Sequence, residues 1–252
     1  MTFDFKDRVA VVTGGSRGIG ASVASTLALA GARVAILDVL EGEAERTCAA
    51  IVSQGGSAKA FKTDITSMRA VKEGRDEILA LWKRIDILVC CAGIVLSKPF
   101  AECDEADWDR VMSVNAKGVF TCCQTILPGM MERRYGKIVN VSSVAAKTGG
   151  GFFGNLIYGA SKAAVISYSK GLAREAGPFG VNVNVVCPSA TDTPMIAGLT
   201  GDDRRRVVDS ILLKRLADPK EIANAIVFLV SDYASFITSE VLNVDGGIMK
   251  GN

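Results

Sequence analysis

The sequence contains no histidine among its 252 residues, and only 6% of them are aromatic. Without histidine, the chain lacks the usual base of a serine hydrolase triad and the most common ligand of zinc and iron sites. We therefore expect neither a triad hydrolase nor a metal site.

Long hydrophobic runs and an excess of one charge are also missing. No uninterrupted apolar stretch approaches the roughly 20 residues needed to cross a bilayer, and residues 1–7 are short and mixed in charge rather than signal-like. The 29 basic and 27 acidic residues leave a net charge of only +2. We expect a cytoplasmic protein with neither a membrane nor a nucleic-acid partner.

Closely spaced cysteine pairs of the C-x-x-C type are absent too. The seven cysteines are odd in number, and most of them lie in apolar runs, where a free cysteine behaves as a small hydrophobic residue. The one dense basic run, Arg-Arg-Arg at residues 204–206, is typical of a solvated helix face.

Short apolar runs alternate with longer helical patterns along the whole chain. The runs predict seven strands, at residues 9–13, 33–38, 58–62, 85–91, 137–142, 181–187 and 241–244. Such alternation implies right-handed crossovers and a parallel sheet with helices on both faces. We predict one α/β domain over residues 1–252 with a doubly wound parallel sheet.

Three segments stand out within this pattern. Asp218-Pro-Lys-Glu221 predicts a helix start, with Asp at the N-cap, Pro at the first helical position and Glu at the third. Residues 147–156 are rich in glycine and aromatic side chains, and residues 189–215 are long and polar. Both segments follow the carboxyl ends of predicted strands, so we expect them to wall a ligand site.

A glycine-rich turn, Thr13-Gly-Gly-Ser-Arg-Gly-Ile-Gly20, joins the first predicted strand to the first predicted helix. Glycine lets the backbone approach a diphosphate closely, and the helix N-terminus adds unpaired N–H groups and a favourable dipole. Tight turns also use glycine for steric reasons alone. The position in the first strand-to-helix turn of the chain favours nucleotide binding.

Tyr158 and Lys162 lie four residues apart in a predicted helix, residues 155–176, and therefore share one of its faces. An ammonium group beside a phenol favours the phenolate, lowers the tyrosine pKa from about 10 and equips the tyrosine as a general base. Taken alone, the pair is better explained as a half-buried tyrosine beside a solvated lysine, because Tyr and Lys occur four apart by chance on many helices. The glycine turn at the other end of the chain favours the catalytic interpretation.

Together these motifs resemble those of the short-chain dehydrogenase/reductase family. Further matches follow in order: Ser113-Val-Asn-Ala-Lys-Gly118, Asn140-Val-Ser-Ser143, Asn243-Val-Asp-Gly-Gly247, and Cys91-Ala-Gly93 where the family has Asn-Ala-Gly. The resemblance is nearly end to end. It implies a compact, single-domain, Rossmann-like fold and hydride transfer between a nicotinamide dinucleotide and a secondary alcohol or ketone.

The resemblance also implies roles for individual residues. Tyr158 would exchange the proton with the substrate oxygen, and Ser143 would orient that oxygen. Lys162 would lower the Tyr158 pKa and bind the nicotinamide ribose, and Asn115 would hold a water that links Lys162 to solvent. Taken singly, Asn115 also suits a helix kink and Ser143 a strand-end cap.

The dinucleotide contacts expected from the glycine turn and the resemblance span the whole chain. They involve Gly14, Ser16, Arg17, Gly18, Ile19, Gly20, Asp38, Asp64, Ile65, Cys91, Ala92, Gly93, Tyr158, Lys162, Pro188, Thr191 and Thr193.

Asp38 bears on the choice of dinucleotide, since it ends the second predicted strand about 20 residues after the glycine turn. A carboxylate there accepts hydrogen bonds from the adenine ribose and repels a 2′-phosphate. Asp also caps turns, and Arg17 beside the glycine turn suits a 2′-phosphate. We expect NAD as the cofactor, with NADP less favoured.

Two features depart from the family pattern. Cys90 and Cys91 stand where two asparagines are usual, and Ser143 and Tyr158 are 15 positions apart, which is longer than the commonest spacing. The extra residues fall in the glycine-rich segment 149–154, over the expected substrate site.

The two wall segments, 149–154 and 189–215, guide the substrate prediction. Phe152 and Phe153 would give one apolar side, whereas hydrogen bonds and positive charge would come from Asn155, Ser189, Thr191 and residues 204–206. This mixture favours a small polar hydroxy compound such as a sugar, polyol or sugar acid.

Two alternatives stay open: an NADPH-dependent 3-oxoacyl-thioester reductase, and a non-catalytic dinucleotide-binding regulator. The intact set Asn115, Ser143, Tyr158 and Lys162 argues against the regulator. The resemblance further implies a homotetramer, assembled through two long helices at residues 104–134 and 155–176.

Overall fold

The computed structural model describes residues 3–151 and 154–249, and its centre is one parallel sheet of seven strands. The strands are β1 Val9–Thr13, β2 Arg33–Asp38, β3 Ser57–Lys62, β4 Ile87–Cys90, β5 Gly136–Val141, β6 Val181–Pro188 and β7 Val241–Val244. Their order across the sheet is β3-β2-β1-β4-β5-β6-β7. Successive strands are added on one side of β1 and then, from β4 onward, on its other side, and sheets of this kind bind dinucleotides at that switch point. The predicted doubly wound sheet is confirmed, with strand ends within two residues of those expected.

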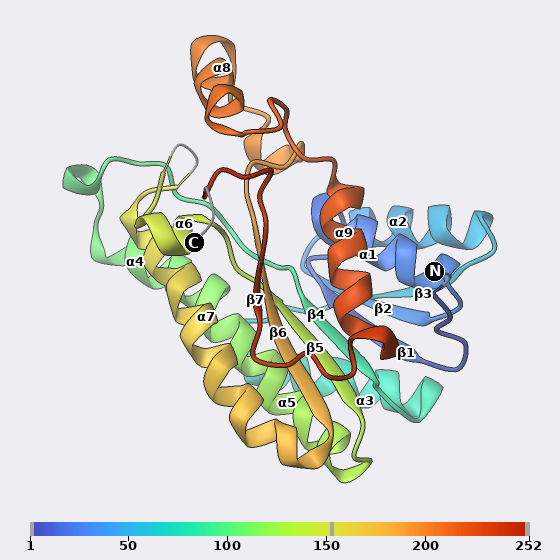
Figure 1. Cartoon of the computed structure of the whole chain (residues 1–252). Helices are drawn as coiled ribbons and strands as arrows, with labels where there is room; N and C mark the ends of the chain where they lie inside the picture. The colour runs from blue at the N-terminus through green and yellow to red at the C-terminus, as the bar shows by residue number, and fades with distance from the viewer. Residues whose placement is uncertain (1–2, 152–153, 250–252) are drawn as a thin grey trace.

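Helices cover both faces of the sheet (Figure 1). One face carries α1 Gly18–Leu29, α2 Glu41–Ser53 and α9 Pro219–Val230; the other carries α3 Met68–Trp82, α5 Gly118–Glu132 and α7 Leu156–Ala176. Alternation along the strands explains this, since Ala10 and Val12 pack in the first core cluster and Val9 and Val11 in the second. Because both faces are buried, the strands read as continuous apolar runs.

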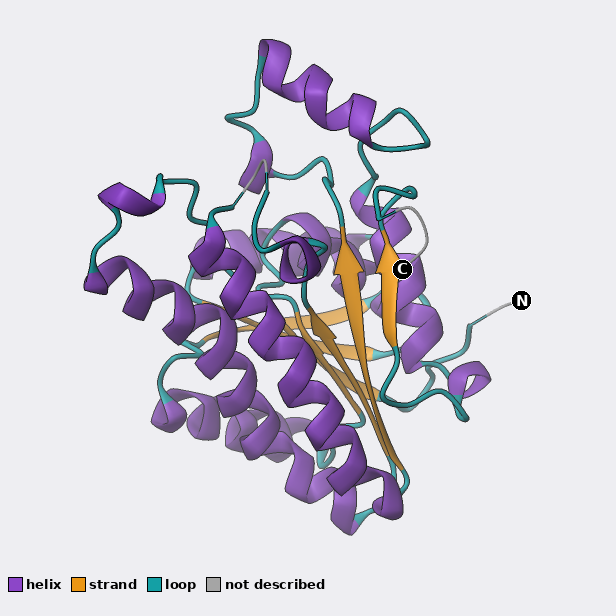
Figure 2. Ribbon diagram, turned by 60° about the vertical axis from the view of Figure 1, so that its left-hand side comes forward, coloured by secondary structure: helices purple, strands orange, loops and turns teal. Residues whose placement is uncertain are grey.

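Shorter helices lie mostly beyond the ends of the strands. They are η1 Phe100–Glu102, α6 Ala145–Thr148, η3 Gly177–Phe179, η4 Pro194–Ile196, α8 Gly201–Ser210 and η5 Asp232–Ala234. Helix α8 stands apart from the two helical layers, at the end of the molecule toward which β6 and β7 point (Figure 2). The helices α6, η4 and α8 follow the carboxyl ends of β5 and β6, at the ligand-binding edge, whereas η3 and η5 precede β6 and β7 at the opposite edge.

The predicted helix over residues 104–134 is a continuous run of three segments. Helix α4, Glu105–Met112, starts at an Asp104 capping box, and a π-helical segment, η2 Ser113–Lys117, leads into α5. Single π turns within α-helices often mark functional sites. This one places the buried Asn115 against the loop that follows β4.

The predicted start of α9 is also confirmed. Asp218 and Glu221 form a capping box, with Pro219 at the first helical position. Among the residues described, no helix is both long and apolar enough to cross a membrane.

Candidate active site

Two adjoining cavities open at the carboxyl edge of the sheet. The first, of about 520 Å³, is lined by Ser143, Tyr158 and Lys162, and we call it the tyrosine cavity. The second, of about 530 Å³, runs along the glycine turn and the ends of β2 and β3, and we call it the glycine-turn cavity. Both are lined by Cys91, Gly93 and Thr193, so together they form one continuous cleft.

Ser143 and Tyr158 meet at the floor of the tyrosine cavity. The Ser143 hydroxyl acts to lower the pKa of the Tyr158 phenol, which is only 8% exposed. The Ser143 hydroxyl oxygen accepts a bond from the Ala145 N–H at 3.1 Å, which leaves its own hydrogen available as a donor. The segment of 15 positions between them therefore loops out without separating the pair.

Lys162 lies beneath the same cavity and is almost fully buried. Its Nζ donates to the Val141 carbonyl oxygen at 3.0 Å and lies 5.9 Å from the centre of the Tyr158 ring. Burial lowers the pKa of Lys162 to about 8. The spacing of four residues does bring both side chains to one site, as predicted.

The predicted lowering of the Tyr158 pKa is not found. Burial raises the pKa of Tyr158 above its ordinary value, and the nearby Ser143 hydroxyl offsets this rise only in part. The prediction considered the neighbouring charge and omitted desolvation, which disfavours the phenolate.

The side chain of Asn115 is fully engaged by protein groups. Its Oδ1 accepts from the Ile94 N–H at 2.8 Å, and its Nδ2 donates to the Ile94 carbonyl at 2.9 Å and to Ser161 Oγ at 3.0 Å. The amide therefore fastens the loop after β4 to helix α7. The role of Asn115 in holding a water that links Lys162 to solvent stays a prediction.

The glycine turn forms a backbone cradle of the kind that a diphosphate requires. Gly14 has a φ of +65°, and a Cβ on it would lie 2.6 Å from Ala92 Cα. A Cβ on Gly20 would lie 2.2 Å from the Gly14 carbonyl oxygen. Helix α1 begins at Gly18 without a side-chain cap, so its first N–H groups are available to an anion.

Asp38 lies where β2 ends, beside this cradle. Its carboxylate accepts from the Ser16 N–H at 3.1 Å and the Leu40 N–H at 3.0 Å, and the residue lines the glycine-turn cavity. A carboxylate has about four acceptor positions, so two bonds leave capacity for ribose hydroxyls. Arg17 is exposed and lines the same cavity.

Every residue of the expected dinucleotide set lines one of the two cavities. Tyr158, Lys162, Pro188 and Thr191 line the tyrosine cavity, Thr193 lines both, and the remaining members line the glycine-turn cavity, with Ile19, Cys91 and Gly93 again in both. The sequence did not reveal Arg110 and Val114 of the helical run over α4 and η2, which also line the glycine-turn cavity. Their spacing of four residues indicates a shared face, but not which face covers the site.

The walls of the tyrosine cavity come partly from the two predicted segments. Gly149, Gly150, Gly151 and Gly154 contribute from the first, whereas Phe152 and Phe153 lie outside the described residues. Apolar side chains dominate the rest of the wall: Val144, Met195, Ile196, Val207, Ile248 and Met249. The last two belong to the C-terminal segment, which was not expected at this site.

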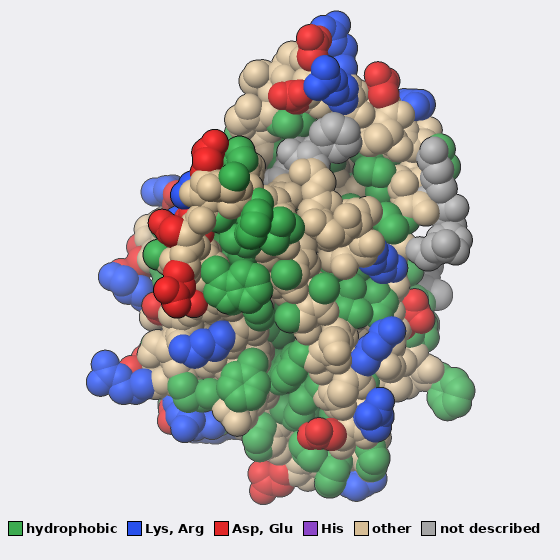
Figure 3. All heavy atoms as spheres, turned by 90° about the vertical axis from the view of Figure 1, so that its left-hand side faces the viewer, with side chains coloured by type: hydrophobic (Ala, Val, Ile, Leu, Met, Phe, Trp, Pro, Cys, Tyr) green, Lys and Arg blue, Asp and Glu red, His purple; other side chains and the backbone are tan. Residues whose placement is uncertain are grey.

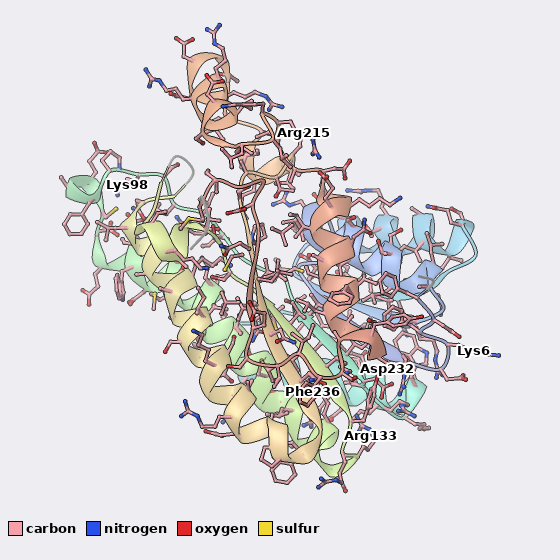
Figure 4. The ribbon with its side chains drawn as sticks, viewed as in Figure 1. Lys6, Lys98, Arg133, Arg215, Asp232 and Phe236 are labelled. Carbon is pink, nitrogen blue, oxygen red and sulfur yellow. The ribbon has the colours of Figure 1, made fainter. Side chains whose placement is uncertain are left out.

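Of the predicted polar contributors, Ser189 and Thr191 line the tyrosine cavity, whereas the arginines and Asn155 do not. Arg205 and Arg206 pair with Asp202 and Asp203 on the exposed surface of α8, and Arg204 lines a separate outer groove. In Figure 4 the arginine labelled near the base of α8, Arg215, also lies at this groove, and it pairs with Glu221.

Asn155 is likewise committed to structure. Its carboxamide oxygen caps α7 by accepting the Ile157 and Tyr158 N–H groups. The expected polar wall was wrong on these points, because sequence position does not fix side-chain direction.

Of the two cysteines that stand where the family usually has asparagines, Cys90 lies in the core and Cys91 lies at the site. Cys90 is buried, and the neighbouring Cys122 and Cys123 thiols on α5 raise its pKa together with burial. Cys91 lines both cavities, close to Lys162. The thiols thus pack as small hydrophobic groups in the first case and face the cleft in the second.

Comparisons with known proteins agree with this geometry. A family model described as enoyl-(acyl carrier protein) reductase matches residues 14–249. The chain is 37% identical to a 3-oxoacyl-[acyl-carrier-protein] reductase of Aquifex aeolicus, over 98% of this chain and 100% of that protein. It is 41% identical to a cis-4-hydroxycyclohexanecarboxylate dehydrogenase of Sinomonas cyclohexanicum, over 96% and 97%.

A solved structure is similar as well. The crystal structure of a 3-oxoacyl-[acyl-carrier protein] reductase from Brucella melitensis superposes with a TM-score of 0.91 at 33% identity, covering 96% of this chain and 91% of that chain. The likeness therefore extends over nearly the whole of both folds.

Proposed function

Because the chain belongs to the short-chain dehydrogenase/reductase family, and so is an NAD(P)-dependent oxidoreductase acting on CH–OH groups, we propose that it interconverts 3-oxoacyl and 3-hydroxyacyl thioesters. The observation that carries this proposal is the apolar wall of the tyrosine cavity, formed by residues such as Val207, Ile248 and Met249. Transfer of an acyl chain from water into such a site lowers its free energy, whereas a sugar or polyol would lose hydrogen bonds to water there. The relatives named as 3-oxoacyl reductases support the same substrate class.

The chemistry divides between the dinucleotide and the protein. When bound, the nicotinamide supplies or accepts the hydride. In reduction, Tyr158 gives its proton to the substrate oxygen while the Ser143 hydroxyl donates to the same oxygen. The Ser143 oxygen already accepts the Ala145 N–H at 3.1 Å, and its own hydrogen is available to donate to the substrate oxygen.

Lys162 then supports the tyrosinate that remains. Its ammonium lies under the cavity beside Tyr158, and a cation there offsets the cost of a buried phenolate. Its pKa of about 8 suits proton exchange near neutral pH. Asn115 positions this machinery by joining the Ile94 loop to the helix that carries both residues.

The dinucleotide favoured by the charges is NAD(H). The buried Asp38 carboxylate beside the glycine turn would repel the 2′-phosphate of NADP(H), and its free acceptor positions suit the ribose hydroxyls. Arg17 opposes this preference without removing it, since its side chain is exposed and its charge is screened by solvent.

A second candidate substrate is an alicyclic hydroxy acid oxidised with NAD⁺. Two observations favour it: the 41% identity with the cis-4-hydroxycyclohexanecarboxylate dehydrogenase, and Asp38, since biosynthetic reductases usually prefer NADPH. A saturated ring also fits an apolar wall.

The test measures kcat/KM for a panel of substrates with each dinucleotide, using NAD(P)H absorbance as the readout. The panel contains acetoacetyl-CoA and longer 3-oxoacyl thioesters, cis-4-hydroxycyclohexanecarboxylate, and sugar acids and polyols, with Tyr158→Phe as the control for non-enzymatic turnover. The highest values for thioesters support the proposal, and the highest for the cyclohexane acid support the second candidate. A clear preference for sugar acids or polyols contradicts both.

We also propose that the protein forms a homotetramer through the face made by α4, α5 and α7. Hydrophobic side chains gather on this face among charged ones (Figure 3), and Trp108, Phe120 and Leu156 are each at least 40% exposed. Exposed apolar patches of this kind mark protein interfaces. Light scattering should give a tetramer that Phe120→Glu dissociates and that Leu29→Glu, on α1, leaves intact.

A further inference from the structure

Helix α4, which lies far from the glycine turn in the sequence, contributes a cationic side chain, Arg110, to the glycine-turn cavity. The charged residues that line this cavity, among those described, are Arg17, Asp38, Asp64 and Arg110. Arg17 belongs to the turn itself, whereas Arg110 comes from the last turn of α4. The cavity is thus lined by two arginines from different elements of the chain.

Arg110 lies at the end of the cleft that is remote from the reacting groups. It lines the glycine-turn cavity with Val114, one helical turn further on, and with Ile65 after β3. Tyr158 and Lys162 line the other cavity. A dinucleotide whose nicotinamide lies at Tyr158 therefore has its adenine half near Arg110.

The guanidinium of Arg110 is only weakly held in the protein. Its contact with Asp107 is 3.8 Å long, at the outer limit for an ion pair, and its side chain is 61% exposed. The Asp107 carboxylate is occupied instead by Lys98, at 2.8 Å, from the segment before α4 where Figure 4 labels that lysine. It also accepts the Asp104 N–H in the capping box. Arg110 can therefore turn toward a ligand without breaking a strong ion pair.

We propose that Arg110 binds the adenine ring of the dinucleotide, with its planar guanidinium stacked on one face of the purine. Apolar side chains of Ile94, Val114 and Ile65 line the same cavity and suit a flat ring. An arginine can stack on an aromatic face in a way that a lysine ammonium cannot. The neighbouring Asp64 and Asp38 carboxylates would weaken its attraction for a phosphate, which makes the ring the better partner.

The test compares the binding of a whole dinucleotide with that of a fragment. Dissociation constants for NADH and for reduced nicotinamide mononucleotide, which lacks the adenine half, are measured by fluorescence titration of wild type, Arg110→Ala and Arg110→Lys. Arg206→Ala, an exposed arginine on α8, is the control for loss of one positive charge.

We expect Arg110→Ala to weaken NADH binding by about 3- to 30-fold, the range for loss of one cation–π contact. Arg110→Lys should lose most of the same affinity, and binding of the mononucleotide should stay unchanged. Unaltered NADH binding in Arg110→Ala overturns the proposal. So does an equal loss for the mononucleotide, which indicates a general change of the cleft, and so does full retention in Arg110→Lys, which indicates a point-charge contact with phosphate.

Discussion

The tyrosine cavity and the glycine-turn cavity adjoin along residues 91–95, yet their walls differ in kind. Lys162 is the one charged residue among the described residues that line the tyrosine cavity, whereas Arg17, Asp38, Asp64 and Arg110 surround the other. The first is made to exclude water from a small reacting centre, where burial shifts pKa values strongly. The second suits a large, charged dinucleotide, which it would contact through backbone N–H groups and exposed charged side chains. Each of these contacts would contribute modestly to the binding free energy.

The largest effect on activity should follow from removing the reacting hydroxyl group of the tyrosine cavity. Tyr158→Phe removes the phenol proton and leaves the ring in place. General acid–base groups contribute about 10²–10⁴-fold, so we expect kcat to fall at least that far while the Kd for the dinucleotide is unchanged. Steady-state kinetics and fluorescence titration give the two numbers. Turnover within a few-fold of wild type would exclude Tyr158 as the acid.

The next largest effect should come from the cradle in the other cavity. Gly14→Ala places a Cβ 2.6 Å from Ala92 Cα at a φ of +65°, so backbone must shift where the diphosphate binds. We expect dinucleotide binding to be lost or weakened by at least 100-fold, equivalent to about 3 kcal/mol or more.

Gly55→Ala is the matched control for this substitution. Gly55 also has a positive φ, of +87°, but nothing lies within 4 Å of an added Cβ. It carries the backbone strain without the collision, and its dinucleotide affinity should equal that of the wild type. Similar losses in both variants would show that strain, rather than the cradle, controls binding.

The buried charge of Lys162 predicts a pH dependence confined to the tyrosine cavity. Its pKa is about 8 in the folded chain and 10.5 as the ordinary value, so between these pH values the unfolded chain binds more protons. The stability of the wild type without ligand should therefore rise with pH across this window, by up to about 3 kcal/mol from this group.

Lys162→Met removes that contribution and keeps a similar length of side chain. In urea unfolding at a series of pH values from 8 to 10.5, the stability difference between Lys162→Met and wild type should shrink steadily as pH rises. Parallel curves for the two proteins would mean that the lysine is not desolvated in solution.

Asp38 offers a smaller and more selective change in the glycine-turn cavity. Asp38→Ser removes the charge that opposes a 2′-phosphate, so the ratio of kcat/KM for NADH over NADPH should fall by about 10- to 100-fold, as repulsion between neighbouring charges at a protein surface amounts to a few kcal/mol. Asp38→Asn keeps an acceptor for the Ser16 or Leu40 N–H groups and controls for their loss. A wild type that prefers NADPH would show that Arg17 dominates instead.

The smallest effect should come from trimming the apolar wall. Met249→Ala shortens one side chain of the tyrosine cavity, and we expect KM for a hydrophobic ketone to rise by a few-fold with kcat nearly constant, since roughly 1 kcal/mol of apolar contact is lost. Val52→Ala, an exposed position on α2, is the control. A large fall in kcat would instead give the C-terminal segment a part in ordering Ser143 and Tyr158.

The sequence by itself determined the sheet, the glycine turn and the pairing of Tyr158 with Lys162. These features are local: strands follow from continuous apolar runs, and residues four apart on a helix share a face whatever lies around them. The expected dinucleotide residues also reached the cleft, because strand ends in a parallel sheet meet at one edge.

The surroundings of those residues depend instead on how the chain packs in three dimensions. The Tyr158 pKa rises because distant segments bury the phenol, Asn115 is committed because the β4 loop offers it two backbone partners, and the C-terminal segment reaches the substrate wall. Residues 204–206 turn to solvent because α8 buries little except Val207. Each outcome depends on contacts between parts of the chain far apart in sequence, and neither periodicity nor spacing records which side of an element those contacts will cover.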